Sequence, residues 1–205
     1  MERQERSPVA QELLDAAIGY VAANGLTDLS LRRLATELGT SHRMLSHHFG
    51  SKEGLWVAII HEVEQRQLAL VDQMVLDRSL SPADAMRAWW QHISHPSLWP
   101  NERLFFEVYG QALHRRAGTA ALLDGIVEWW LAPISAAGKA QGLSPADARA
   151  SARLALAVTR GLLLDLLATE DRAGVDAAME RWIALNTRSQ GQMARKGSRP
   201  SVRPG

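Results

Sequence analysis

Apolar residues recur at helical spacing along nearly the whole chain, and runs in which apolar and polar residues strictly alternate are scarce. Residues 8–24 are the first such stretch, and their apolar positions share one face of a helix: Leu14, Ala17, Ile18 and Val21. Gly25 follows directly, and glycine readily takes the left-handed conformation that ends a helix. We therefore predict an all-α protein whose first helix spans residues 8–24.

Two short helices are expected next. Ser30 can cap a helix over residues 31–38, which Gly39 ends, and Ser41 can cap another that runs through His48. Gly50 and Ser51 then end that helix and start a long one that reaches about residue 76. Two short helices joined by a turn that contains glycine are typical of a helix-turn-helix.

The second of these short helices has one apolar stripe and one polar face. Leu45 and Phe49 lie four residues apart and are expected to pack against Leu34 and Leu38. The residues left facing outward are Ser41, His42, Arg43, Ser46 and His47. The free N–H groups at the start of the helix suit a phosphate, and an arginine at position 43 suits the O6 and N7 atoms of guanine. This face predicts an interface with double-stranded DNA.

From residue 13 to about residue 60 the chain resembles the DNA-binding region of the TetR family of bacterial transcriptional regulators. The resemblance lies in four segments: LLDAA (13–17), NGL (24–26), SLRRLATELGTS (30–41) and LSHHFGSKEGL (45–55). It implies a three-helix DNA-binding domain at residues 1–50 and a helical effector-binding and dimerisation domain at residues 51–190, linked by the helix at 51–76. It also implies a homodimer that binds a pseudo-palindromic operator as a repressor and releases it when a small-molecule effector binds.

The family's DNA contacts can be transferred position by position. Phosphate contacts fall on Ser30, Ser41, His47 and Lys52, and base or groove contacts fall on Thr40, His42, Arg43, Met44 and Ser46. Two positions depart from the usual pattern, because Arg43 and Met44 replace a small Gly-Thr pair and Ser46 replaces a tyrosine. We expect these departures to change the operator sequence, since arginine is a strong donor to guanine and methionine can contact a thymine methyl group.

Charge is distributed unevenly along the chain. Five basic residues and no acid lie in residues 188–205, so that the rest of the chain has 18 basic and 22 acidic residues and a net charge of −4. Between Ser30 and Lys52, however, four basic residues (Arg32, Arg33, Arg43 and Lys52) face a single acid, Glu37. Positive charge therefore gathers at the predicted DNA interface, and Arg32 is predicted to contact DNA as well. The basic tail, residues 191–205, is expected to be disordered.

The second half of the chain is rich in aromatic residues, with tryptophan pairs at positions 89–90 and 129–130. Neighbours in a helix point about 100° apart, so either one ring of each pair lines a cavity or subunit contact, or both lie in a thick core. We expect an effector pocket lined by aromatic side chains: Trp89, Trp90, Phe106, Tyr109, Trp129 and Trp130.

The segment 152–169 is apolar nearly all round, so it should be buried on several sides. Together with a helix at 175–185 it is expected to form a four-helix bundle with the same two helices of a second subunit.

Other functions are less well supported by the residues. A metal site at His42, His47 and His48 is disfavoured because their spacing does not place them on one helix face, and no cofactor is expected. His61-Glu62 fails the H-E-x-x-H motif at Gln65, and a small helical enzyme would need an unrecognised site. A helical dimerisation module that no longer reads DNA is a further alternative. No membrane span or signal peptide is expected, so we expect the protein to be cytoplasmic.

Overall fold

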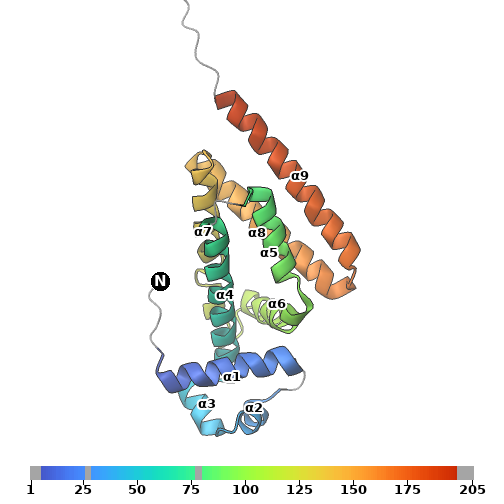
Figure 1. Ribbon diagram of the computed structural model, residues 1–205. Coiled ribbons are helices and arrows are strands. Elements are labelled where there is room, and N and C mark those ends of the chain that lie inside the picture. Colours follow the sequence, from blue (N-terminus) through green and yellow to red (C-terminus); the bar gives the residue numbers. More distant parts are fainter. Residues whose placement is uncertain (1–5, 26–28, 77–79, 198–205) are drawn as a thin grey trace, which may run out of the picture. The chain divides into compact units, whose positions relative to one another are not determined.

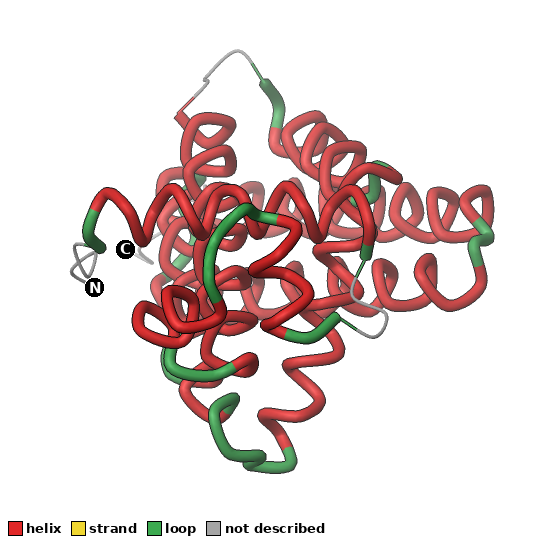
Figure 2. Tube along the Cα trace, turned by 90° about the horizontal axis from the view of Figure 1, so that it is seen from below, coloured by secondary structure: helices red, strands yellow, loops and turns green. Residues whose placement is uncertain are grey.

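The computed structural model describes residues 6–25, 29–76 and 80–197, and every regular element in these ranges is a helix (Figures 1 and 2). The elements are α1 (Pro8–Asn24), α2 (Leu31–Glu37), α3 (His42–Phe49), α4 (Lys52–Leu76), α5 (Pro82–Ile93), η1 (Pro96–Leu98), α6 (Trp99–Leu113), η2 (Ala120–Leu123), α7 (Ile126–Ala140), α8 (Pro145–Thr169) and α9 (Arg172–Gly197). The predicted all-α class is confirmed.

Serine caps fix where several of these helices begin. The hydroxyl groups of Ser7, Ser30, Ser41, Ser81 and Ser144 each accept a hydrogen bond from a backbone N–H in the first turn of the helix that follows. Such caps satisfy donors that have no partner inside the helix. Gly25 and Gly50, at φ +70° and +75°, end α1 and α3 as their sequence context predicts.

The helices pack into two compact units. The first comprises residues 1–70 and 95–128, and its fully buried side chains include Leu14, Leu34, Leu45, Leu55 and Leu104. The second comprises residues 71–94 and 129–205 and buries Trp90, Leu131, Leu166 and Met179. Because α6 packs against α1, it belongs to the same compact unit as the helix-turn-helix. The predicted functional boundary between residues 50 and 51 stays a prediction.

The last helix is longer than the sequence predicts. The expected helix over residues 175–185 is too short, because α9 begins at Arg172 and runs to Gly197. It therefore includes residues 191–197 of the stretch expected to be disordered, and residues 198–205 lie outside the described residues. A polar segment without proline continues a helix where no break is imposed, so the loss of apolar periodicity after residue 185 does not mark the helix end.

One stretch, Ala120–Ala140, is long and apolar enough by length and composition to cross a membrane. It contains two separate helices, η2 and α7, with Gly125 at φ +80° between them. Pro133 also lies inside α7. The stretch is therefore weak evidence for a membrane span.

Candidate nucleic-acid interface

The helix-turn-helix is built from α2 and α3, which contact each other. Leu34 of α2 and Leu45 of α3 are fully buried, whereas Leu38 and Phe49 are half-buried. Gly39 takes a φ of +64° in the turn between the helices, a conformation that costs glycine little. The buried pair holds the two helices together and leaves the opposite side of α3 in solvent.

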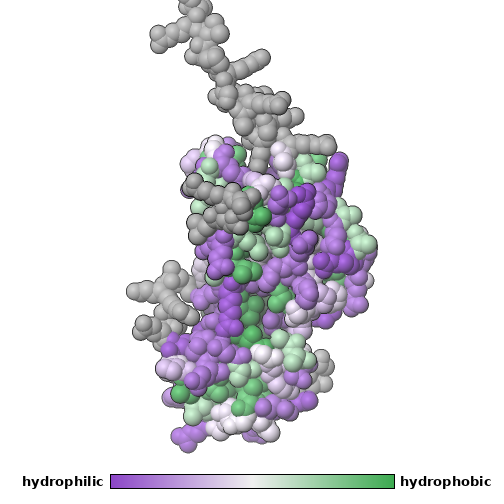
Figure 3. All heavy atoms as spheres, in the orientation of Figure 1, coloured by the Kyte–Doolittle hydropathy of each residue, from purple (hydrophilic) through white to green (hydrophobic). Residues whose placement is uncertain are grey.

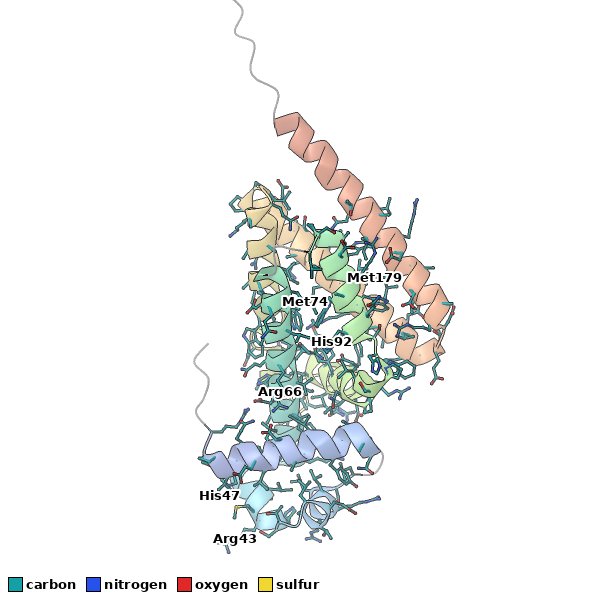
Figure 4. The ribbon with its side chains drawn as sticks, in the orientation of Figure 1. Arg43, His47, Arg66, Met74, His92 and Met179 are labelled. Carbon is teal, nitrogen blue, oxygen red and sulfur yellow. The ribbon has the colours of Figure 1, made fainter. Side chains whose placement is uncertain are left out.

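The structure places the ten predicted DNA contacts on the first unit, at the start of α2, along α3 and at the start of α4. Seven of them are exposed, namely Ser30, Arg32, Ser41, His42, Arg43, Met44 and His47, and three are half-buried, namely Thr40, Ser46 and Lys52. Figure 4 shows Arg43 pointing away from α1 at the outer side of α3. Their roles in DNA binding remain predictions that the arrangement permits.

The basic side chains of this face are available to an external partner. Among the described residues, neither Arg32 nor Arg43 forms an ion pair or a side-chain hydrogen bond. Lys52 places its Nζ atom 5.9 Å from the centre of the Trp56 ring, which is a cation–π contact. Ser30 and Ser41 already accept backbone N–H bonds at 3.2 Å and 3.1 Å, so their hydroxyl groups can still donate to a phosphate.

Ion pairs attach α1 to α4 behind this face. Glu62 of α4 is buried and accepts hydrogen bonds from Arg6 at 3.2 Å and from Arg66 at 3.1 Å. Arg66 also pairs with Asp15 of α1. Burial lowers the pKa of His61, the neighbour of Glu62, and the positive charge of Arg6 adds to this effect. These ion pairs connect α1 and the residue two positions before it to α4 within the first unit.

A metal site at the histidines of α3, which their spacing disfavours, finds no support among the described residues. Among the described residues, no group of three or more histidine, aspartate or glutamate side chains is arranged to hold a metal ion. The rings of His47 and His48 instead meet edge to face, with centroids 5.0 Å apart.

The six predicted effector residues are divided between the two units. Phe106 and Tyr109 lie half-buried in the first unit, and the four tryptophans lie in the second. Trp89 and Trp90 are both buried, which favours the thick-core alternative for this pair. The rings of Trp89 and Trp130 lie 5.3 Å apart between centroids, and Trp90 donates its Nε1–H to Asp176 at 2.6 Å. Their role in effector binding remains a prediction.

A small cavity in the first unit lies between α4 and α6, away from those six residues. Its lining consists of Ile59, Ile60, Val63, Glu64, Asn101, Glu102, Leu104 and Phe105. The Oδ1 atom of Asn101 is buried there without a hydrogen-bond partner. Sequence analysis missed these residues, since a buried Asn-Glu pair in the first turn of a helix looks like an ordinary exposed helix start.

Comparison with known proteins agrees with this geometry. Residues 13–59 match the family model described as "Bacterial regulatory proteins, tetR family", and this segment contains α2, α3 and most of α1. Residues 13–59 therefore carry the DNA-binding region of the TetR family. The chain is a DNA-binding transcriptional regulator of the helix-turn-helix class and not an enzyme.

Individual TetR-family relatives are distant in sequence. The transcriptional repressor NicS of Pseudomonas putida is 27% identical over 146 residues, which cover 68% of each chain. The repressor AcnR of Corynebacterium glutamicum is 35% identical over 63 residues, 31% of this chain and 34% of that one. The chain thus spans about two thirds of the length of NicS and about one third of AcnR.

Solved structures share the fold over most of the chain. A TetR regulator from Legionella pneumophila has a TM-score of 0.69 at 17% identity and covers 89% of this chain and 99% of that one. GusR of Salmonella enterica has a TM-score of 0.65 at 24% identity, with 89% and 97% covered. The likeness therefore extends through the second unit, where the family model does not reach.

Proposed function

We propose that this regulator is a cytoplasmic repressor that binds a pseudo-palindromic operator as a homodimer and releases it when a small molecule binds. The observation that carries the proposal is the outer face of α3, where Arg43 and Met44 are exposed and Arg43 has no partner among the described residues. Arginine paired with guanine and an apolar side chain beside a thymine methyl are the contacts that read sequence in a major groove. NicS and AcnR are both named repressors, which supports the same sign of regulation.

An apolar stripe on α8 supports the homodimer. Leu154 and Leu164 are 56% and 50% exposed, and Ala157, Gly161 and Ala168 are exposed at the spacing that continues the same helix face. On α9, Leu185 is 48% exposed. The expectation that segment 152–169 is buried on several sides is thus not met within one chain. A second copy that packs its own α8 and α9 on this stripe would bury it as a four-helix bundle.

Two recognition helices in such a dimer would enter major grooves about 34–36 Å apart, or a multiple of that distance. The helix α4 is suited to link an effector to this spacing, because residues 52–70 belong to the first unit and residues 71–76 to the second. An effector that binds better to a dimer with another spacing would lower DNA affinity by its differential affinity and by no more.

The proposal is tested by selecting bound sequences from random DNA with the purified protein at near-physiological salt. We expect an enriched pseudo-palindrome. Arg43→Ala should weaken binding to it by about 1–3 kcal/mol and relax the preference at one base pair, whereas Lys52→Ala should weaken all duplexes alike. Equal losses for Arg43→Ala on selected and random duplexes would refute its role in base reading. No enrichment even at low salt would make the interaction module the leading interpretation.

The oligomeric state is tested separately by sedimentation equilibrium. Leu164→Glu places a charge in the middle of the α8 stripe and should convert dimer to monomer. Leu113→Glu is the matched control, because Leu113 of α6 is 61% exposed and lies outside α8 and α9. A Leu164→Glu protein that remains dimeric would rule out the α8 stripe as the interface.

A further inference from the structure

A basic corner follows α6 and is not explained by the helix-turn-helix. We call residues 114–118, His-Arg-Arg-Ala-Gly, the α6 corner. All five residues are exposed, and the nearest acidic residues in sequence are Glu107 before it and Asp124 after it. The described part of the chain shows no hydrogen bond or ion pair for the side chains of Arg115 or Arg116.

Arg115 occupies a backbone position that normally selects glycine. Its φ is +51°, and the N–H groups of Arg115 and Arg116 bond back to the carbonyl oxygens of Ala112 at 2.8 Å and Gln111 at 3.2 Å. This pattern ends many helices, and glycine is preferred at its left-handed residue because a Cβ atom is strained there. Within the described chain the Arg115 side chain forms no hydrogen bond or ion pair that would offset this strain. Its function should therefore involve an external partner.

The α6 corner is attached to the junction that follows the recognition helix. Gly118 has a φ of +82°, and a Cβ atom added to it would lie 2.8 Å from Cβ of Glu53 and 3.5 Å from Oγ of Ser51. Ser51 and Lys52 follow directly after α3, and Lys52 is a predicted phosphate contact. The α6 corner and the recognition helix thus belong to one unit and meet the same end of α4. Glu53, in the first turn of α4, is an acidic residue that lies beside Gly118 of the α6 corner.

We propose that Arg115 and Arg116 bind the phosphate backbone of the duplex that α3 reads, outside the bases that α3 contacts. This role rests on DNA binding by α3. The phosphates that border a major groove about 12 Å wide run past both ends of a helix lying in it, and an arginine side chain is long and forked enough to hold one of them. Duplex DNA is the partner because the α6 corner is fixed to the end of the helix-turn-helix itself. The contact adds affinity without sequence preference.

The substitution Arg115→Gly separates this role from a structural one. Glycine removes the cation and also relieves the strained φ, so the protein should be as stable as the wild type or more stable. Binding is measured by fluorescence anisotropy over a range of salt concentrations, on the selected duplex and on a random duplex. The slope of log K against log salt should fall by about 0.9 for each lost phosphate contact, which corresponds to about 5-fold weaker binding per contact at 0.15 M salt. Arg116→Ala should lower the slope by a similar amount. The double variant should lower it by about twice as much.

Two controls isolate the cause. Glu170→Gly relieves the other non-glycine residue with positive φ among the described residues, at φ +58° after α8, and should leave the salt slope unchanged. Lys139→Ala removes an exposed cation from the second unit and should also leave it unchanged.

Duplex length provides an independent measurement. Wild-type protein should bind the selected sequence more tightly when the duplex extends about one helical turn beyond it on each side than when the duplex ends at the sequence. The Arg115→Gly and Arg116→Ala variants should lose this difference. An Arg115→Gly protein that is folded and keeps the wild-type slope would overturn the proposal, and so would equal losses in Arg115→Gly and Lys139→Ala. A wild-type protein that binds no duplex at low salt would overturn DNA binding by α3 and this proposal together, whereas sequence-specific binding with an unchanged Arg115→Gly slope would overturn this proposal alone.

Discussion

Two neighbours on α3, Met44 and Leu45, should separate the stability of the recognition helix from its function. Leu45 is 0% exposed and packs in the core of the first unit, whereas Met44 is 39% exposed on the outer face. Both side chains are apolar and of similar size, and both sit on the same helix of 8 residues. Replacing each with alanine therefore compares the loss of a buried apolar side chain with the loss of an exposed one of similar size.

The magnitude for Leu45→Ala follows from its burial. The substitution removes three buried carbon groups, and each contributes about 0.8 kcal/mol to the free energy of unfolding, which gives about 2.4 kcal/mol. The cavity left behind adds to this cost. We expect a loss of about 3–4 kcal/mol in the free energy of unfolding. Met44→Ala leaves no cavity and should change that free energy by less than about 0.5 kcal/mol.

The assay is urea unfolding followed by far-UV circular dichroism, together with DNA binding on the selected duplex. Leu45→Ala should lower the urea midpoint without a large change in the slope of the transition. Met44→Ala should leave the midpoint unchanged and weaken binding at sites where a thymine methyl contacts Met44. A loss below about 1 kcal/mol for Leu45→Ala, or an equal loss for Met44→Ala, would show that Leu45 does not hold α3 in place.

Three further predictions concern single contacts. Ser41→Ala should destabilise α3 by about 1 kcal/mol and Ser41→Gly by only a few tenths, while equal losses of DNA affinity in both would identify a phosphate contact by the hydroxyl group. Asp176→Ala leaves the Nε1–H of Trp90 without its acceptor and should cost about 1–3 kcal/mol in thermal unfolding; no change would show that water replaces the carboxylate. Burial lowers the pKa of His61 below its ordinary 6.5, so the unfolded chain binds more protons there and the free energy of unfolding should fall as pH decreases below about 6.5. His61→Gln should reduce this pH dependence, and an unchanged profile would assign it to other groups.

Helix starts were the most predictable part of the fold, because their signals are local. Ser30 and Ser41 cap α2 and α3 as predicted, and Gly25 ends α1 at the predicted residue. The helix end at Arg115 carries no such signal, since an arginine stands where glycine is expected. The extent of α9 was missed because its C-terminal part lacks the apolar period on which the prediction depended.

Buried polar contacts were not predictable, because each partner lies far away in the sequence. Gln67 donates to Glu102 at 2.9 Å across 35 positions, and both side chains are buried. Glu62 is likewise buried between Arg6 and Arg66, although a charged residue is rarely buried unless it is paired. Only the packing of α4 against its neighbours brings such groups together. The same limit applies to the tryptophans, whose helix positions could be predicted but whose burial could not.

The apolar segment of α8 is less buried in a single chain than its sequence predicts. Hydrophobicity on nearly every side predicts burial on several sides, yet Leu154 and Leu164 remain half-exposed in one chain. Scattered exposed leucines need no explanation, but here Gly161 and two alanines complete one continuous face between them. Small residues flanked by leucines let two helices approach closely, and a polar helix face would have served a monomer better. The sequence pattern of this helix is therefore better explained by assembly than by the fold of one chain, which is why Leu164→Glu should change the oligomeric state while leaving the fold of each unit intact.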